Sequence, residues 1–413
     1  MTPSFGLATL AALVALPAGA TARFPGEVRL GGTLPLSGAD AATGASFREG
    51  YELAVEQANQ RGGVQVGGKR LPVKLILRDD AGDKAAGVSG AERLLADDSV
   101  DFLLGTFNSS MVEVQSVVAE KHGVPYVAGG ASTAELYARN LRYLFGLQAP
   151  VKMLASAEMG WIEEQQKAGR LPRPARLALI AEDTVHGREF RTGALKSVER
   201  SPGFWKVVLD EQFPLNAKDF RPLISRVKEA AADVFLADAH MPDFIALHRQ
   251  YLAAKLCLRV VSYGVRGSEA EAAKALGAEN VAYLLSGVFW NDQLGSKGLN
   301  REFVEGFRKR YGHSPMFYNA LAYESVRAVL AAVEAAGSVD REKVRAALAS
   351  LKMETILPSG TLNFPADYGQ QAHYSFLVLQ NQPDGSSPIV YPDYLATAPG
   401  QLDPRCARGT TRP

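Results

Sequence analysis

Residues 28–60, VRLGGTLPLSGADAATGASFREGYELAVEQANQ, contain the pattern that decides the fold. The first seven are an apolar run typical of a strand, and it ends in the turn Pro35-Leu36-Ser37-Gly38. Beyond the turn, apolar residues recur at the spacing of one helical face, namely at Phe47, Tyr51, Ala54, Val55 and Ala58. A strand followed directly by an amphipathic helix is typical of a parallel sheet covered by helices.

The same alternation continues along the chain. Apolar runs predict further strands at residues 73–77, 101–104, 124–128, 176–181, 205–213, 234–237, 260–263, 281–289, 361–364 and 374–380. Helical periodicity lies between them at residues 88–95, 111–121, 188–199, 219–231, 243–254, 300–311, 315–335 and 340–351. The fold class is therefore α/β, with two doubly wound lobes. Ligands of such sheets bind where strands end at their carboxyl edges and the strand order reverses.

Composition excludes some function classes. Of 413 residues, 45 are Lys or Arg and 44 are Asp or Glu, which gives a formal net charge of +1. A chain with this balance has no field that would hold nucleic acid or an anionic membrane. The 47% of hydrophobic residues is ordinary for a protein with a packed core.

The first 22 residues resemble a leader rather than part of the fold. An apolar run from Phe5 to Leu16 precedes Ala20-Thr21-Ala22, a cleavage signal that predicts a mature chain starting near Arg23. The run is shorter than the roughly 20 residues that span a bilayer. No Lys or Arg precedes it, so a buried N-terminal helix remains the alternative reading. Export predicts a periplasmic protein.

The chain has two cysteines, Cys257 and Cys406. They could pair in an oxidising compartment. Cys406 falls in a polar, irregular segment, residues 396–413, which the composition predicts to be disordered, so the sequence leaves the pairing open.

A series of short motifs resembles the type I periplasmic solute-binding proteins of branched-chain amino-acid type ABC importers, the leucine/isoleucine/valine-binding protein-like family. The motifs are GTLPLSG at 32–38, GYELAVEQAN at 50–59, LGTFNSS at 104–110, GGAST at 129–133, DTVHG at 183–187, KDF at 218–220, and Pro315 with Tyr323-Glu324. Each is weak alone, but their order and spacing cover the chain from about residue 27 to 395.

The resemblance implies a type I periplasmic binding protein fold, in which a three-strand hinge joins the two lobes and ligand is trapped between them. It divides the chain into a leader (1–22), a first lobe (27–148 and 283–355), a second lobe (149–282 and 356–395) and a tail (396–413). The expected protein is a monomer that captures a small carboxylate-bearing molecule and delivers it to a membrane permease.

In the first lobe, the ligand-binding candidates are Ser109, Ser110, Ala131, Ser132 and Thr133. Ser109 stands between a strand and a helix, where a hydroxyl beside free N–H groups suits a carboxylate. It could equally be a plain helix cap. The resemblance alone raises residues 131–133 above an ordinary turn, because family members use these positions for backbone and hydroxyl contacts.

In the second lobe, the candidates are His186, His240 and Arg266. The resemblance places His186 where many relatives carry a tyrosine, and a histidine there would titrate near neutral pH. Relatives that bind α-amino acids offer an acid near Arg266, but here the first acid is Glu269. If Arg266 faces the cleft, we expect it to favour a carboxylate without an α-amino group; a solvated loop arginine is the alternative.

Two aromatic residues, Phe107 and Trp290, are candidates for the cleft wall, because aromatic walls shield small ligands from water. Enzyme signatures are missing: there is no G-x-S-x-G elbow, phosphate-binding glycine loop or HExxH metal motif. We therefore expect neither catalysis nor a cofactor or metal. A ligand-sensing regulator or amide/urea sensor of the same fold is the main alternative, and an α/β enzyme is a weaker one.

Overall fold

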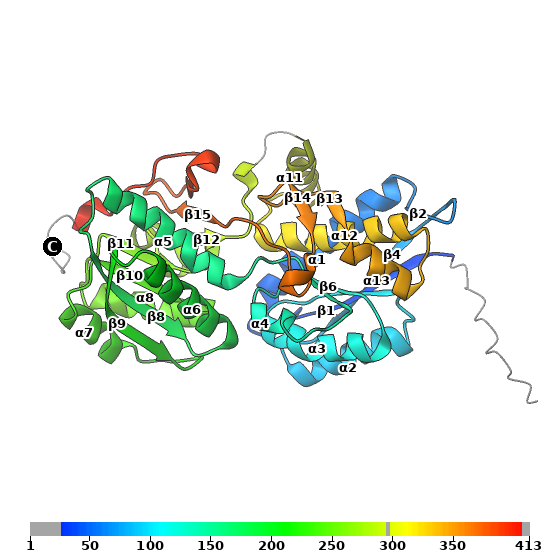
Figure 1. Ribbon diagram of the computed structural model, residues 1–413, viewed down its shortest axis with the longest axis horizontal. Helices are drawn as coiled ribbons and strands as arrows, with labels where there is room; N and C mark the ends of the chain where they lie inside the picture. Colours follow the sequence, from blue (N-terminus) through cyan, green and yellow to red (C-terminus); the bar gives the residue numbers. More distant parts are fainter. Residues whose placement is uncertain (1–25, 295–297, 407–413) are drawn as a thin grey trace, which may run out of the picture.

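The computed structural model describes residues 26–294 and 298–406, which form two α/β lobes lying side by side (Figure 1). Among these residues, no helix is long and apolar enough to cross a membrane. The expected leader, residues 1–22, lies outside the described part of the chain.

The first lobe is built on a five-stranded parallel sheet with the order β4-β1-β5-β6-β7. The strands are β1 (Val28–Leu34), β4 (Val73–Asp79), β5 (Phe102–Leu104), β6 (Tyr126–Ala128) and β7 (Leu144–Gly146). The helices are α1 (Ala41–Gln60), α2 (Lys84–Ala96), α3 (Ser109–His122), α4 (Ala134–Tyr137), α11 (Gly298–Tyr311), α12 (Phe317–Ala336) and α13 (Arg341–Ala349). Two small hairpins complete the lobe: β2 (Val64–Val66) with β3 (Lys69–Leu71), and β13 (Lys352–Glu354) with β14 (Thr361–Asn363).

Helices α1 and α12 pack along each other in the first lobe, while α2 packs against α3. Gly50 allows the first contact to be close, because a Cβ there would lie 2.3 Å from the carbonyl oxygen of Asn319.

The second lobe is built on a seven-stranded sheet with the order β16-β15-β12-β11-β10-β8-β9. Five strands are parallel, namely β8 (Ala175–Glu182), β9 (Trp205–Phe213), β10 (Val234–Asp238), β11 (Val260–Tyr263) and β12 (Leu285–Val288). Strands β15 (Leu377–Gln380) and β16 (Ile389–Tyr391) add an antiparallel edge. The helices are α5 (Val151–Lys167), α6 (Val185–Arg200), α7 (Arg221–Glu229), α8 (Met241–Ala253), α9 (Ala270–Leu276) and α10 (Ala278–Val281). Short 3-10 turns elsewhere in the chain are Asp292–Leu294, Ala366–Tyr368, Asp393–Leu395 and Pro404–Cys406.

Both parallel sheets reverse their strand order at one place. In the first sheet the chain crosses from one side of β1 to the other, between β4 and β5. In the second sheet the equivalent position lies at β8, between β9 and β10. Loops that follow β1, β5, β8 and β10 are therefore the places where a crevice is expected.

The strand–helix alternation was predicted well, and β1, β9 and β11 have the predicted bounds. Sequence reasoning missed β7 and α5. Strand β7 has only three residues, too few for a pattern. Helix α5 buries the polar residues Glu158, Gln165 and Gln166 together with its apolar ones, so its core-facing side lacks a clean apolar stripe.

The lobe boundaries differ from those expected at two places. Residues 283–288 were expected in the first lobe, but β12 pairs with β11 and β15 in the second sheet. Residues 356–372 were expected in the second lobe, but Phe364 packs on Phe145 of β7, and the amide of Ala372 donates to the carbonyl of Gly146. The chain thus passes between lobes after β7, after β12 and just before β15.

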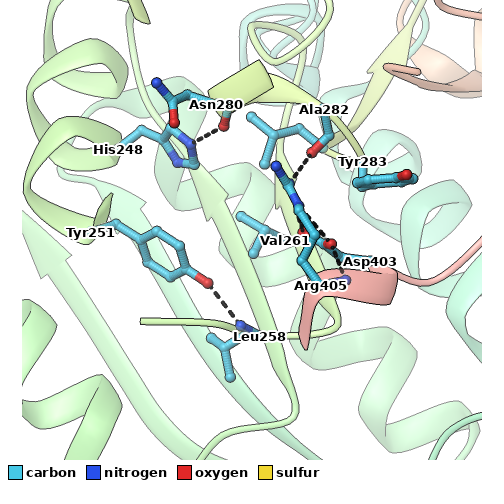
Figure 2. Close-up of a pocket in the computed structure, with 10 residues that line it drawn as sticks. His248, Tyr251, Leu258, Val261, Asn280, Ala282, Tyr283, Asp403 and Arg405 are labelled. Carbon is cyan, nitrogen blue, oxygen red and sulfur yellow. Dashed lines mark hydrogen bonds and ion pairs between the residues drawn. The ribbon is translucent and has the colours of Figure 1, made fainter. Parts of the chain in front are cut away.

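The C-terminal segment was predicted to be disordered, and for residues 396–406 this prediction is wrong. A disulfide joins Cys406 to Cys257, across a separation of 149 residues. The amide of Asp403 donates to the carbonyl of Arg259, and the Arg405 guanidinium donates to the carbonyl of Glu279. Arg405 also donates to the carbonyl of Ala282 (Figure 2). This segment lies at the end of the second lobe that faces away from the first lobe (Figure 1). Residues 407–413 of the predicted tail lie outside the described part.

We predict that replacing both cysteines, Cys257→Ser with Cys406→Ser, destabilises the second lobe. The disulfide closes a long loop and so restricts the unfolded chain. Without it the unfolded chain gains conformational freedom, and the free energy of unfolding falls by about 2–5 kcal/mol. Differential scanning calorimetry should show a transition lowered by about 5 °C or more. The oxidised parent protein is the reference, and equal transition temperatures would contradict the stabilising role.

Candidate ligand-binding cleft

A cleft of about 510 Å³ lies between the two lobes, and both contribute to its wall. The lining residues follow the carboxyl ends of strands in both sheets: Ala39 and Asp40 after β1, Phe107–Met111 after β5, Thr184 and His186 after β8, Asp238–His240 at and after β10, and Val265 with Arg266 after β11. Further lining residues are Gly82, Lys84, Gly130, Ser132, Gln148, Leu215, Asn216, Pro242, Asp243, Phe289, Phe317 and Tyr318. The cleft therefore lies where the two topological switch points meet.

Ser109 lies on the cleft wall at the first position of α3, and Ser110 lines the cleft beside it. The cap of α3 is Asn108, whose side-chain oxygen accepts from the amide of Met111 at 2.9 Å, so the reading of Ser109 as the cap is wrong. The Ser109 hydroxyl instead accepts a hydrogen bond from Thr133 at 3.0 Å. Thr133 thus holds the Ser109 side chain from the protein side, and the Ser109 hydroxyl lies beside the N-terminus of α3.

Ser132 also lies on the wall, but its two neighbours do not. Ala131 and Thr133 are fully buried. The Ala131 carbonyl accepts from the Tyr137 hydroxyl, while Thr133 donates to Ser109. The expectation that Ala131 and Thr133 contact the ligand is therefore corrected: they support the wall from the protein side.

His186 of the second lobe closes the cleft toward Ser132. Helix α6 begins after Thr184, whose hydroxyl accepts from the amide of Gly187, and this cap sets the position of His186. The Nδ1 atom of His186 lies 3.2 Å from the Ser132 hydroxyl, and Nε2 lies 3.4 Å from the Asp238 carboxylate. Burial opposes the charged ring, but Asp238 outweighs it, and the pKa of His186 is raised above its ordinary value.

Asp238 is an acid in the cleft that sequence reasoning missed. It is the last residue of β10, is 3% exposed, and lines the cavity. Burial alone would raise its pKa, but His186, His240 and Arg266 together hold the pKa of the carboxyl below its ordinary value. An acid at the carboxyl end of an apolar strand was the available signal. The ionised Asp238 gives the cleft a group that could bind a ligand cation or N–H donor.

His240 lies on the cleft wall, held by Glu182 at the end of β8. The two Glu182 oxygens accept from the backbone amide of His240 at 2.8 Å and approach its ring Nδ1 at 2.7 Å. Because these contacts hold the backbone amide and the Nδ1 side of the imidazole ring, only the opposite side of the ring is left to face the cavity.

Arg266 lines the cleft but already has partners. Its Nη1 atom lies 2.8 Å from Glu269, in a pair whose side chains are both less than 10% exposed, and 2.7 Å from the hydroxyl of Tyr318. Tyr318 belongs to α12 of the first lobe, so Arg266 connects the lobes. The alternative of a solvated loop arginine is wrong, because Arg266 is buried and lines the cleft, but its charge is already paired with Glu269.

The aromatic part of the wall contains Phe107, Phe289, Phe317 and Tyr318. Phe107 meets Tyr318 edge to face, with ring centroids 5.7 Å apart. Trp290 was expected on this wall but lies in the first-lobe core, where it packs on Phe303 and its indole N–H donates to Asn300. Sequence cannot separate a core aromatic residue from a cleft one when both follow the same strand.

Metal ligands are not gathered in the cleft. Within residues 26–294 and 298–406, no group of three or more His, Cys, Asp or Glu side chains could hold a metal ion.

Comparisons with known proteins agree with this architecture. Residues 27–385 match the model of a family described as periplasmic binding protein. The chain belongs to this family. The predicted type I periplasmic binding protein fold, with two α/β lobes, is confirmed.

Curated relatives are similar to this chain over most of their length. The Leu/Ile/Val-binding protein homolog 7 of Brucella abortus (strain 2308) is 28% identical over 394 residues, covering 93% of this chain and 96% of the relative. Homolog 8 from the same strain is 27% identical and covers 90% and 92%.

Solved structures share the fold at lower identity. A leucine binding protein from Thermotoga maritima superposes with a TM-score of 0.74 at 20% identity and covers 88% of this chain and 97% of its own. A solute binding protein of an ABC transporter from R. palustris, in complex with benzoate, gives a TM-score of 0.71 at 20% identity and covers 92% and 99%.

We predict that Arg266→Met destabilises the protein more than the double variant Arg266→Met/Glu269→Met. The single change leaves Glu269 as an unpaired buried charge, a loss of about 3–5 kcal/mol, whereas removing both charges avoids that cost. Urea unfolding of the two variants and the parent protein measures the difference. A double variant that is less stable than the single one would show that the pair itself is the stabilising element.

Proposed function

We propose that this protein is the extracytoplasmic solute-binding component of an ABC importer. It captures a small carboxylate-bearing molecule between its lobes and delivers it to a membrane permease. Its family membership and the Leu/Ile/Val-binding names of its relatives support this role. Catalysis has no part in the proposal, and the exported monomer would act in the periplasm.

The observation that carries the proposal is that polar anchors from both lobes meet inside one cleft. Ser109 and Ser132 come from the first lobe, and His186 comes from the second, with the Ser132–His186 contact at 3.2 Å. A ligand that touches both sets stabilises the closed arrangement by its differential affinity for it. Shifting such an equilibrium almost completely takes about 5.5 kcal/mol. A micromolar ligand, at about −8 kcal/mol, supplies that amount.

The proposed carboxylate position is beside the Ser109 and Ser132 hydroxyls at the start of α3. Hydroxyl donors together with the positive end of a helix are suited to an anion. The aromatic wall of Phe107, Phe289 and Tyr318 would cover the rest of the ligand.

Two ligand groups fit this position. One structural neighbour, from Streptococcus pneumoniae, is in complex with isoleucine, and the R. palustris neighbour is in complex with benzoate. The preference for an acid without an amino group, which rested on Arg266, loses its support because Glu269 balances that charge. Asp238 could receive an ammonium group, so both amino acids and amino-free organic or aromatic acids stay within the proposal. Nothing among the described residues favours a sensor over a transport component.

A thermal-shift panel on mature protein, unfolded and refolded to remove bound ligand, should identify the ligand group. The panel contains leucine, isoleucine, benzoate, dicarboxylates, amides and urea. A compound that binds only the native state raises the melting temperature with dose. We expect at least one carboxylate to do so, and stabilisation by amides or urea alone would contradict the carboxylate proposal.

We predict that Ser109→Ala weakens binding of the best carboxylate in that panel by roughly tenfold or more, since a hydrogen bond to a charged group contributes about 1.5–3 kcal/mol. Isothermal titration calorimetry measures the change, and the melting temperature without ligand checks that folding is intact. Ser225→Ala, at an exposed position on α7, is the matched control. Unchanged affinity of the Ser109 variant would remove this hydroxyl from the site.

A further inference from the structure

A carboxylate of the second lobe, next to the cleft but not part of its lining, makes a hydrogen bond to the first lobe. Glu189 lies on α6, and its Oε2 atom accepts from the backbone amide of Ala134, the first residue of α4, at 2.7 Å. Its other oxygen, Oε1, is buried and makes no hydrogen bond within the described part of the chain. Glu189 therefore connects the two lobes, and both lobes contribute to enclosing its carboxyl, since Lys152 of α5 also lies against it.

The groups around Glu189 favour its ionised form only weakly. On α6 it faces His186, on α5 it faces Lys152 with its backbone amide, and on α4 it lies near the buried hydroxyl of Tyr137. Burial outweighs the Ala134 amide and the charges of His186 and Lys152, and it raises the pKa of Glu189 to about 7. A buried carboxylate with one unpartnered oxygen is the physical reason.

We propose that closure of the two lobes takes up a proton on Glu189, so that this residue couples ligand capture to pH. The coupling to ligand rests on the proposed function, whereas the coupling of closure to pH does not. When the lobes separate, the Ala134 contact is lost and the Glu189 carboxyl meets water.

The sign of the effect follows from the two protonation states. In the open form an exposed Glu189 titrates near the ordinary value of about 4.3. In the closed form its pKa is about 7. Between these values the closed form binds more protons than the open form, so acidification favours closure. Ligand affinity should therefore rise as the pH falls from 8 to 5.5.

The coupling at Glu189 is separable from titration of His186. The main partner of His186 is Asp238, which belongs to the same lobe, so this pair persists when the lobes part. Glu189 loses its backbone partner on opening, because Ala134 belongs to the other lobe. A variant at 189 should remove this pH dependence and leave the Asp238 partner of His186 in place; it should also lower the pKa of His186, because the charge of Glu189 contributes to raising it.

The first test measures closure without ligand. Single-molecule energy transfer between dyes on Val117→Cys in α3 and Lys196→Cys in α6, both exposed positions, reports the distance between the lobes. The parent protein should show a closed-to-open ratio that rises about thirtyfold from pH 8 to pH 5.5. Glu189→Gln, which keeps an acceptor for Ala134 and carries no charge, should show a high ratio at both pH values. Equal ratios for the parent and this variant at pH 8 would overturn the proposal.

The second test measures affinity for the best compound from the thermal-shift panel, with leucine and benzoate as fixed probes. We expect the parent protein to bind more tightly at pH 5.5 than at pH 8, by up to about thirtyfold, and Glu189→Gln to lose most of that difference. Glu199→Gln, at an exposed position near the other end of α6, is the matched control and should behave like the parent. A parental pH dependence in Glu189→Gln overturns the proposal. If no compound in the panel binds, that result counts against the proposed function only. The energy-transfer test is made without ligand and still decides the proton coupling.

Discussion

Parallel strands constrain this structure more than any single contact does. A strand that pairs in parallel with its neighbour must be joined to it by a crossover, here a helix in most cases, so the carboxyl ends of all five strands in each parallel set lie on the same side. The order of strands then reverses at β1 in one lobe and at β8 in the other. Because the chain connects the lobes with these edges facing each other, the loops from both sheets converge on one cleft. The order of the strands therefore determines where the cleft lies, whichever side chains line it.

Charge in the cleft is nearly balanced within the protein itself. Arg266 is paired with Glu269, His186 with Asp238, and His240 with Glu182. Such pairing offsets part of the desolvation cost of placing charged groups in a buried wall. It also means that the hydroxyls of Ser109 and Ser132, which carry no charge, are the groups with the most freedom to accommodate a ligand anion. An anion in this cleft would therefore be held by the positions of the hydroxyl donors rather than by one unpaired cation.

Much of the fold could be predicted because its strands are apolar runs bounded by turns, as β1, β9 and β11 show. The edges of the fold could not be predicted. The three-residue strand β7 and the polar face of α5 lack a hydrophobic period. The C-terminal residues are held by a disulfide and by hydrogen bonds to residues far away in the sequence. Loops that were predicted from the sequence do line the cleft, but the directions of several side chains on them were not predicted. Trp290 turned into the core, Asn108 rather than Ser109 capped α3, and Arg266 found Glu269 three residues later. Spacing along a loop does not fix these directions.

The disulfide between Cys257 and Cys406 makes part of the molecule a covalent ring. Two of the three passages between the lobes, after β12 and before β15, lie inside this ring, and so do the helices α11, α12 and α13 of the first lobe. A single cut of the backbone anywhere between residues 257 and 406 would therefore leave one covalently connected molecule. The part of the first lobe that stands between these passages is thus tethered to the second lobe at both of its ends. A protease that nicks an exposed loop there releases no fragment unless the disulfide is also reduced.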